Sequence, residues 1–207
     1  MEPNMFCYQC QETAKGTGCI LKGVCGKESH TAQAMDLLLF VVRGVSVVAD
    51  VLRKADCPVS EEVNIFVTDA LFCTITNANF DDESILKRVD KGITMRNGLI
   101  QEAKHNKVLL PKVDELTWQG TRDDYAGKAK TVGVLREQNE DLRSLKELLV
   151  YGLKGMAAYL EHVMRLGFND DTVHVFMQRA LATIAVESLS AEERVKLVLE
   201  AGELSLI

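Results

Sequence analysis

Four cysteines near the start of the chain have the type and spacing of metal ligands. The sequence reads Cys7-x2-Cys10-x8-Cys19-x5-Cys25, so four of its six cysteines fall within nineteen residues. A C-x2-C pair on a turn can bring two thiolates to one metal centre, and two later cysteines can complete the ligand set. We therefore predict that these four cysteines bind a metal cofactor together.

An iron–sulfur cluster, a zinc ion and a pair of disulfides could all use such thiols. Zinc and iron–sulfur clusters both accept four cysteines, so the number of ligands does not choose between them. Zinc ribbons normally have two C-x2-C pairs, whereas a polymetallic cluster tolerates the five-residue separation of the second pair better. The segment also carries Lys15, Lys22 and Lys27 against Glu12. This local positive charge favours an anionic iron–sulfur cluster, with zinc as the alternative.

The disulfide interpretation depends on the compartment. A chain of 207 residues is long for a disulfide scaffold, and residues 1–6 lack the basic and apolar regions of a secretory signal. We therefore expect a cytoplasmic protein. Thiols stay reduced in the cytoplasm, and clustered cysteines there usually bind metal or carry out redox chemistry.

Charge and hydropathy argue against two classes of partner. The formal net charge is -6, and no run of lysine or arginine has the density of a phosphate-binding surface, so we expect no nucleic acid partner. The longest apolar run, residues 37–42, is six residues long. A membrane-spanning helix needs about 20 such residues, so we expect no membrane association.

The remaining candidate residues are predicted to be structural. Cys73 lies on the apolar face of a predicted helix, where a cysteine usually packs as a small hydrophobic residue. Cys57 precedes Pro58 in a predicted loop. No metal-ligand spacing or neighbouring nucleophile accompanies the four histidines, which are His30, His105, His162 and His174. We predict no catalytic residue.

The elements that must position the cysteines are predicted to be helices. Residues 5–29 hold four glycines and no long apolar periodicity, which indicates a loop-rich segment. From Thr31 onward, apolar residues recur at spacings of three and four, which predicts a long and mostly buried helix. Further helices are predicted from Ser60, over residues 81–106, 123–132, 139–166 and 170–187, and from Ser190.

Two of these helices have recognisable starts. Ser60, followed by two glutamates, predicts a hydroxyl cap, and Ser190 with Glu193 predicts a capping box. Residues 107–122 are predicted to be a connection. Because strand alternation is missing from the sequence, we predict an all-α fold. It would consist of two consecutive antiparallel three-helix groups in a helical bundle domain (30–207), at about residues 30–107 and 123–207, preceded by the cysteine segment at 5–29.

With these residues identified, a family resemblance can be stated. The run MFCYQCQETAKGTGC at residues 5–19, continued by KGVCGK at 22–27, resembles the N-terminal signature of the hybrid-cluster proteins, also called prismane proteins or hydroxylamine reductases. The resemblance extends to TITNANFD at 74–81 and NEDLRSLKELL at 139–149. It implies an N-terminal helical domain with a cubane-type 4Fe-4S cluster. The ligands of that cluster would be Cys7, Cys10, Cys19 and Cys25.

The resemblance also implies an activity that this chain does not complete alone. Family members reduce hydroxylamine to ammonia and water at a hybrid Fe-S-O cluster, whose ligands lie in later α/β domains that this sequence lacks. We therefore expect a separate domain or fragment that relays electrons. The expected partners are a redox donor protein and either the missing C-terminal domains or a second copy of the chain. The alternative is a structural zinc-binding interaction module.

Overall fold

The computed structural model describes residues 5–186 and 188–207, which contain eight α-helices and no β-strand. The helices are α1 (Ser29–Lys54), α2 (Glu61–Cys73), α3 (Asp82–His105), α4 (Asp114–Thr117), α5 (Tyr125–Val132), α6 (Glu140–Arg165), α7 (Asp171–Val186) and α8 (Ala191–Leu204). Short 3-10 helices lie at Ala14–Gly16, Arg122–Asp124 and Val134–Arg136. The predicted all-α fold is confirmed. Among the described helices, none combines the length and the hydropathy that crossing a bilayer would require.

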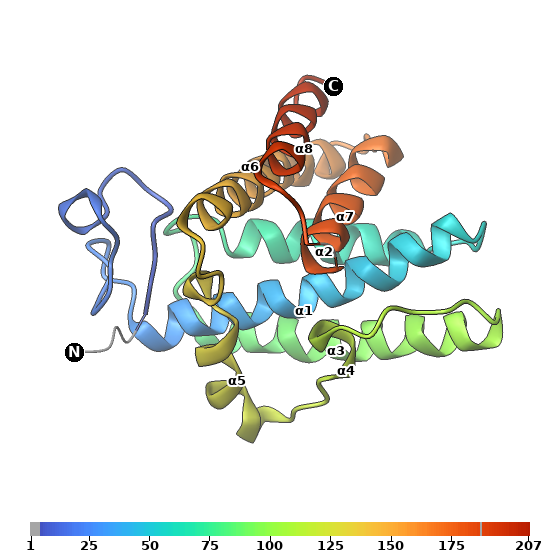
Figure 1. The fold of residues 1–207 in the computed structure, drawn as a ribbon, viewed down its shortest axis with the longest axis horizontal. Helices are drawn as coiled ribbons and strands as arrows, with labels where there is room; N and C mark the ends of the chain where they lie inside the picture. Colours follow the sequence, from blue (N-terminus) through green and yellow to red (C-terminus); the bar gives the residue numbers. More distant parts are fainter. Residues whose placement is uncertain (1–4, 187) are drawn as a thin grey trace.

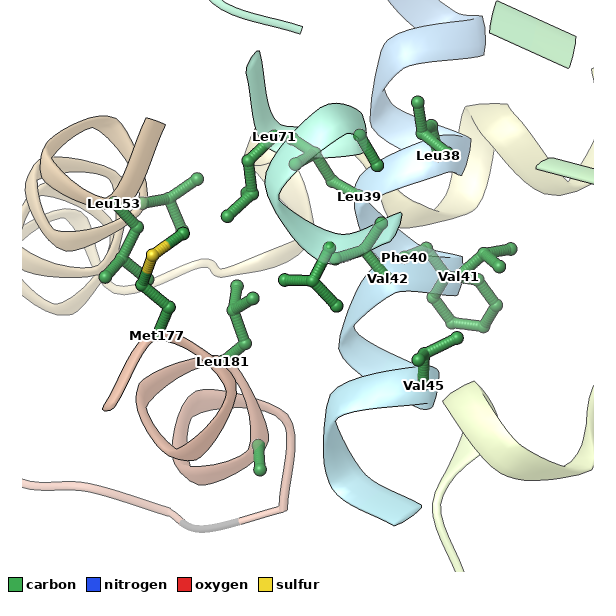
Figure 2. Packing of buried hydrophobic residues seen from close by; sticks show 14 of the residues in the cluster. Leu38, Leu39, Phe40, Val41, Val42, Val45, Leu71, Leu153, Met177 and Leu181 are labelled. Atoms are coloured by element: carbon green, nitrogen blue, oxygen red, sulfur yellow. The ribbon is translucent and has the colours of Figure 1, made fainter. Parts of the chain in front are cut away.

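Helix α1 lies in the middle of the fold and is buried on all sides. Most of its 26 residues are buried, which is the pattern of a helix surrounded by protein. It packs against α2, α3, α5 and α7 (Figure 1). Figure 2 shows Leu39 and Val42 on the side of α1 that faces Leu71 and Leu181, while Phe40 lies on the opposite side. Each side of α1 therefore receives a different neighbouring helix.

Both halves of the chain contribute to one hydrophobic core. The contacts of α1 with α7 and of α2 with α6 join the first half to the second, and their buried residues form one continuous cluster. The cysteine segment, predicted at residues 5–29, ends one residue earlier because α1 begins at Ser29. It lies at one end of this helical body, where α1 begins (Figure 1). The division into two three-helix groups stays a prediction.

The observed helix starts agree with most of the predicted ones. Ser190 and Glu193 form the predicted capping box of α8. Ser60 is the residue before α2, as predicted, but its side chain makes no capping hydrogen bond. The predicted hydroxyl cap is therefore wrong, and the exposed position of Ser60 leaves its hydroxyl open to water. The predicted end of the 170–187 helix falls on residue 187, outside the described residues.

The connection at 107–122 contains a short helix that the sequence analysis did not predict. Helix α4 lies against α1 at Gly44, where a Cβ atom would come within 2.5 Å of the carbonyl oxygen of Glu115. Arg96 is fully buried, and its guanidinium donates hydrogen bonds to the carbonyl oxygens of Glu115 (2.9 Å) and Trp118 (2.8 Å). A four-residue helix has too few residues for a periodic pattern, and these tertiary contacts hold it in place.

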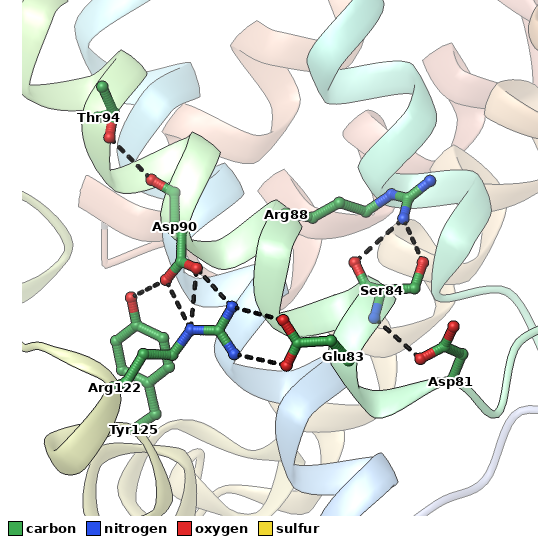
Figure 3. A network of polar contacts seen from close by, with 8 residues as sticks. All are labelled: Asp81, Glu83, Ser84, Arg88, Asp90, Thr94, Arg122 and Tyr125. Carbon is green, nitrogen blue, oxygen red and sulfur yellow. Dashed lines mark hydrogen bonds and ion pairs between the residues drawn. The ribbon is translucent and has the colours of Figure 1, made fainter.

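A polar network attaches the chain after α4 to the surface of α3. The guanidinium of Arg122 contacts the carboxylates of Glu83 (3.1 Å) and Asp90, and the hydroxyl of Tyr125 donates to Asp90 (2.7 Å; Figure 3). Burial and the hydrogen bond to Asp90 raise the pKa of Tyr125 above its ordinary value. The start of α5 is thereby fixed on α3.

The crossing of α1 and α3 requires a glycine, and this can be tested by substitution. A Cβ atom on Gly92 would lie 2.6 Å from Val41 Cγ1 and 2.8 Å from Phe66 Cζ, whereas one on Gly98 of the same helix meets no atom within 4 Å. We expect Gly92→Ala to lower the free energy of unfolding by about 1–3 kcal/mol through overpacking. Gly98→Ala should raise it by about 0.5–1 kcal/mol. Urea unfolding measures both changes, and equal effects would contradict the close crossing.

Candidate functional site

All four cysteines of the N-terminal segment line one hollow in the structure. The turn between α2 and α3 forms part of its wall through Thr76 and Asn77. Within residues 5–186 and 188–207, no three Cys, His, Asp or Glu side chains are gathered closely enough to hold a single metal ion. The structure therefore brings the predicted ligands to a common site, at spacings wider than one ion requires.

Cys7 and Cys19 are joined through their backbones. The two residues form an antiparallel bridge, with N–O distances of 3.0 and 2.9 Å. The hydroxyl of Thr13 donates to the carbonyl oxygen of Cys7 (3.1 Å), and the backbone N–H of Ala14 donates to the Cys19 sulfur (3.5 Å). This short bridge brings residues twelve positions apart to the same side of the hollow.

A glycine turn positions Cys25. The N–H of Gly23 donates to the carbonyl oxygen of Lys27 (2.7 Å), and the N–H of Gly26 donates to that of Gly23 (2.9 Å). Gly26 has φ of 93°, a conformation that favours glycine. A Cβ atom on Gly23 would lie 3.0 Å from the Cys25 sulfur. Glycines at both positions therefore allow the turn to bring the exposed Cys25 to the hollow.

Two buried lysines flank the cysteines. Lys27 is 1% exposed, and its ammonium donates to the carbonyl oxygen of Thr76 (2.6 Å) and contacts the sulfur of Met35 (3.3 Å). Lys154 of α6 is 2% exposed, and its ammonium donates to the side-chain oxygen of Gln9 (3.1 Å) and to the carbonyl oxygen of Thr74 (3.2 Å). The site is therefore electropositive and suits an anionic group.

These surroundings shift the pKa values of two thiols in opposite directions. Burial raises the pKa of Cys7 above its ordinary value, although the charges of Lys27 and Lys154 oppose this rise. Burial also acts to raise the pKa of Cys19, but hydrogen bonds from Ala14, Val24 and Thr13 and the charge of Lys27 outweigh it, so the pKa is lowered. Cys19 is thereby favoured as a thiolate, which is the form that binds metal.

Lys154 also belongs to a group of charges on α1 and α6. Burial, followed by the negative charge of Glu147, raises the pKa of Asp36 to about 7. Burial lowers the pKa of Lys154 to about 8, against the attraction of Glu147 and Asp36. Asp36 points toward Gly133, where a Cβ atom would lie 2.8 Å from its Oδ2. An acid and a base with pKa values near neutrality thus lie behind the cysteine site.

Lys27 was predicted as one charge of the segment, and Gln9 and Thr76 lie in the runs that carry the family resemblance but had no predicted role. Lys154 was not predicted. The available signal was weak. Lys154 is a single lysine beside Leu153 on the buried side of α6, where an apolar residue is expected. Its contact with Gln9 spans 145 residues of the chain, and no local pattern encodes such a contact.

The other cysteines and the histidines lie outside the hollow. Cys73 packs in the main core, as predicted, and its sulfur accepts a hydrogen bond from Asn79 (3.1 Å). The sulfur of Cys57 contacts the carbonyl oxygen of Ala55 (3.6 Å). His174 is buried, with Thr68 and Asn169 as hydrogen-bonding partners, and His30 Nε2 lies 2.8 Å from the Asp82 carboxylate. None of these residues lines the cysteine site.

The raised pKa of Asp36 predicts a pH-dependent effect of Asp36→Asn in metal-free protein. Between its ordinary pKa of 3.8 and its folded value of about 7, the folded state binds more protons than the unfolded state. This residue's contribution to stability therefore falls as the pH rises through that interval. Asparagine avoids the loss, so the variant should gain about 1–3 kcal/mol of unfolding free energy at pH 8 and little near pH 4.

Urea unfolding of wild type and variant at a series of pH values measures this difference. The raised pKa would be contradicted if the gain were the same at every pH.

Comparison with known proteins places the chain in a family. A profile of the Prismane/CO dehydrogenase family matches residues 5–207. A hydroxylamine reductase of Bacteroides thetaiotaomicron is 52% identical over 201 residues, which cover 97% of this chain and 36% of that protein. Hydroxylamine reductases of Porphyromonas gingivalis and Desulfitobacterium hafniense are 48% and 46% identical, covering 98% and 97% of this chain and 37% of each relative. The chain spans just over a third of the length of these relatives, and it belongs to the Prismane/CO dehydrogenase family.

Proposed function

We propose that this chain is the electron-relay domain of a hydroxylamine reductase and holds a 4Fe-4S cluster on Cys7, Cys10, Cys19 and Cys25. The observation that carries the proposal is that all four cysteines line one hollow, beside two buried ammonium groups. Four thiolates are the donor set that a 4Fe-4S cluster takes in proteins, and the surrounding positive charge suits the anionic cluster that they would form. The names of the relatives supply the reaction to which the electrons would go.

When bound, such a cluster accepts and releases one electron at a time. The protein groups around it would set how readily it does so. The N–H of Ala14 donates to the Cys19 sulfur, and hydrogen bonds of this kind to cluster sulfurs raise the reduction potential. Four protein ligands leave no position open for substrate, so we assign the site to electron transfer and propose no catalytic residue.

The site is accessible from the surface. Cys25 is exposed, and four apolar side chains on the same segment are also exposed: Tyr8, Ile20, Leu21 and Val24. A redox donor protein could approach the thiolates on this side through a small, transient interface. We propose that the electrons pass onward to a hybrid Fe-S-O cluster, held by the part of the relatives that this chain does not cover. A second copy of the chain could also occupy that position. The proposed compartment is the cytoplasm.

The first test is the metal content of protein purified without oxygen. We expect a brown protein with close to four irons and four acid-labile sulfides per chain, because the four thiols form a complete ligand set. Zinc at one ion per chain without sulfide would replace this proposal with the structural zinc module. Elemental analysis and sulfide determination on the same sample distinguish the two.

The second test assigns the ligands. Cys10→Ser and Cys19→Ser should each weaken cluster binding by at least about tenfold, because each removes one of four thiolates. Cys57→Ser is the matched control and should retain the cluster. Cys73→Ser should also retain it, because Cys73 lies outside the hollow and Asn79 can donate to the new hydroxyl. Equal loss of iron in all four variants would refute the assignment.

A further inference from the structure

Lys154 connects the second half of the chain to the cysteine segment. Lys154 is a buried residue of α6, and its ammonium donates to Gln9 Oε1 and to the carbonyl oxygen of Thr74. Gln9 lies between the first two cysteines, and its Oε1 also accepts the backbone N–H of Thr76 (3.1 Å). The turn that carries Cys7 and Cys10 is therefore attached to the end of α2 through one amide group.

The second cysteine pair is attached at the same place. Lys27, two residues after Cys25, donates to the carbonyl oxygen of Thr76. The backbone N–H of Thr76 therefore bonds to the turn of Cys7 and Cys10, while its carbonyl oxygen bonds to the residue that follows the Cys19–Cys25 segment. Thr76 has φ of 39°, which is unfavourable for a threonine. The bonds to Gln9 and Lys27 hold Thr76 in this conformation, and the turn after α2 thereby sets the distance between the two pairs.

Within the described residues 5–186 and 188–207, neither of the two ammonium groups forms a direct ion pair. Among the residues that the structure describes, the hydrogen-bonding partners of Lys154 and Lys27 are uncharged. Glu147 and Asp36 act on Lys154 only over a distance. A buried cation is costly unless it is paired. A cluster with four thiolates would carry the negative charge that these lysines face.

We infer that Lys154 is a positioning residue for the cofactor, which holds the Cys7–Cys10 turn through Gln9 and favours electron uptake through its positive charge. The inference rests on the proposed function for its second part only. In that part, a one-electron donor such as dithionite is oxidised and the cluster gains one negative charge. A fixed cation beside the cluster makes this gain more favourable. The first part concerns the folded protein without any metal.

The first experiment measures hydrogen exchange in metal-free protein. Lys154→Met and Gln9→Ala should each speed exchange of the Thr76 amide and of residues 7–13 by at least about tenfold, because hydrogen bonds to a charged group are lost. Lys128→Met is the matched control. Lys128 is another largely buried lysine, which pairs with Asp114 and lies over Phe40. Lys128→Met should leave hydrogen exchange in residues 7–13 at the wild-type rate. The positioning role would be overturned if exchange in Gln9→Ala and Lys154→Met also stayed at the wild-type rate.

The second experiment measures the midpoint potential of cluster-loaded protein by titration with dithionite. Lys154→Met should weaken electron uptake by about tenfold, which is a shift of 59 mV to lower potential for a one-electron couple. Lys154→Arg keeps the charge and should stay near the wild type. Gln9→Ala loosens the turn but keeps the ammonium, so its shift should be smaller than that of Lys154→Met.

The outcomes separate the two parts of the inference. If Lys154→Met has the wild-type potential, the charge effect is refuted, and it is equally refuted if the control Lys128→Met shifts the potential as much as Lys154→Met does. If Lys154→Met fails to fold, Gln9→Ala still tests the positioning and Lys154→Arg still tests the charge, since a potential well below wild type in Lys154→Arg contradicts it. If the wild type binds no iron and sulfide, the proposed function fails, whereas hydrogen exchange still decides whether Lys154 positions the turn.

Discussion

The burial of α1 on all sides is the constraint on which the rest of the structure depends. Burying one large apolar side chain is worth about 1.5–3 kcal/mol, and α1 contributes many of the buried apolar side chains of the main core. Four other helices must surround it to bury them, which fixes their arrangement. Because the cysteine segment leads directly into α1, the packing of this one helix also decides where the four cysteines lie.

The same core contains charges that a purely apolar interior would not need. Arg43 and Glu115 lie with Nε and Oε1 3.7 Å apart, both nearly inaccessible to solvent, and burial lowers the pKa of Arg43. Arg96 instead satisfies backbone carbonyls. Burying such charged groups costs desolvation free energy, and the cost is offset only when each group is paired or hydrogen-bonded. Polar contacts of buried cations therefore accompany the hydrophobic packing around α1.

Much of this arrangement could be predicted from the sequence. The helices follow from apolar spacing, and the capping box at Ser190 follows from two residue types three positions apart. The four cysteines could be grouped because their ligand chemistry is local. Helix α4 could not be predicted because tertiary contacts with Arg96 and Gly44 hold it. Lys154 could not be assigned because its role depends on Gln9, which only the folded chain brings close. Ser60 precedes α2 as predicted, yet its hydroxyl makes no capping hydrogen bond to the helix.

The separation of Gln9 and Lys154 along the chain has a consequence for biosynthesis. The two residues are 145 positions apart, so the cysteine segment leaves the ribosome long before α6 is made. At translation rates of about 5–20 residues per second, the delay is roughly 7–30 s. During this interval the thiols lack the cation that orders the first cysteine turn. The hydrogen bond between Gln9 and Lys154 is therefore available only after α6 has docked, so a cofactor of the kind proposed would meet the complete arrangement of this turn only after α6 is translated.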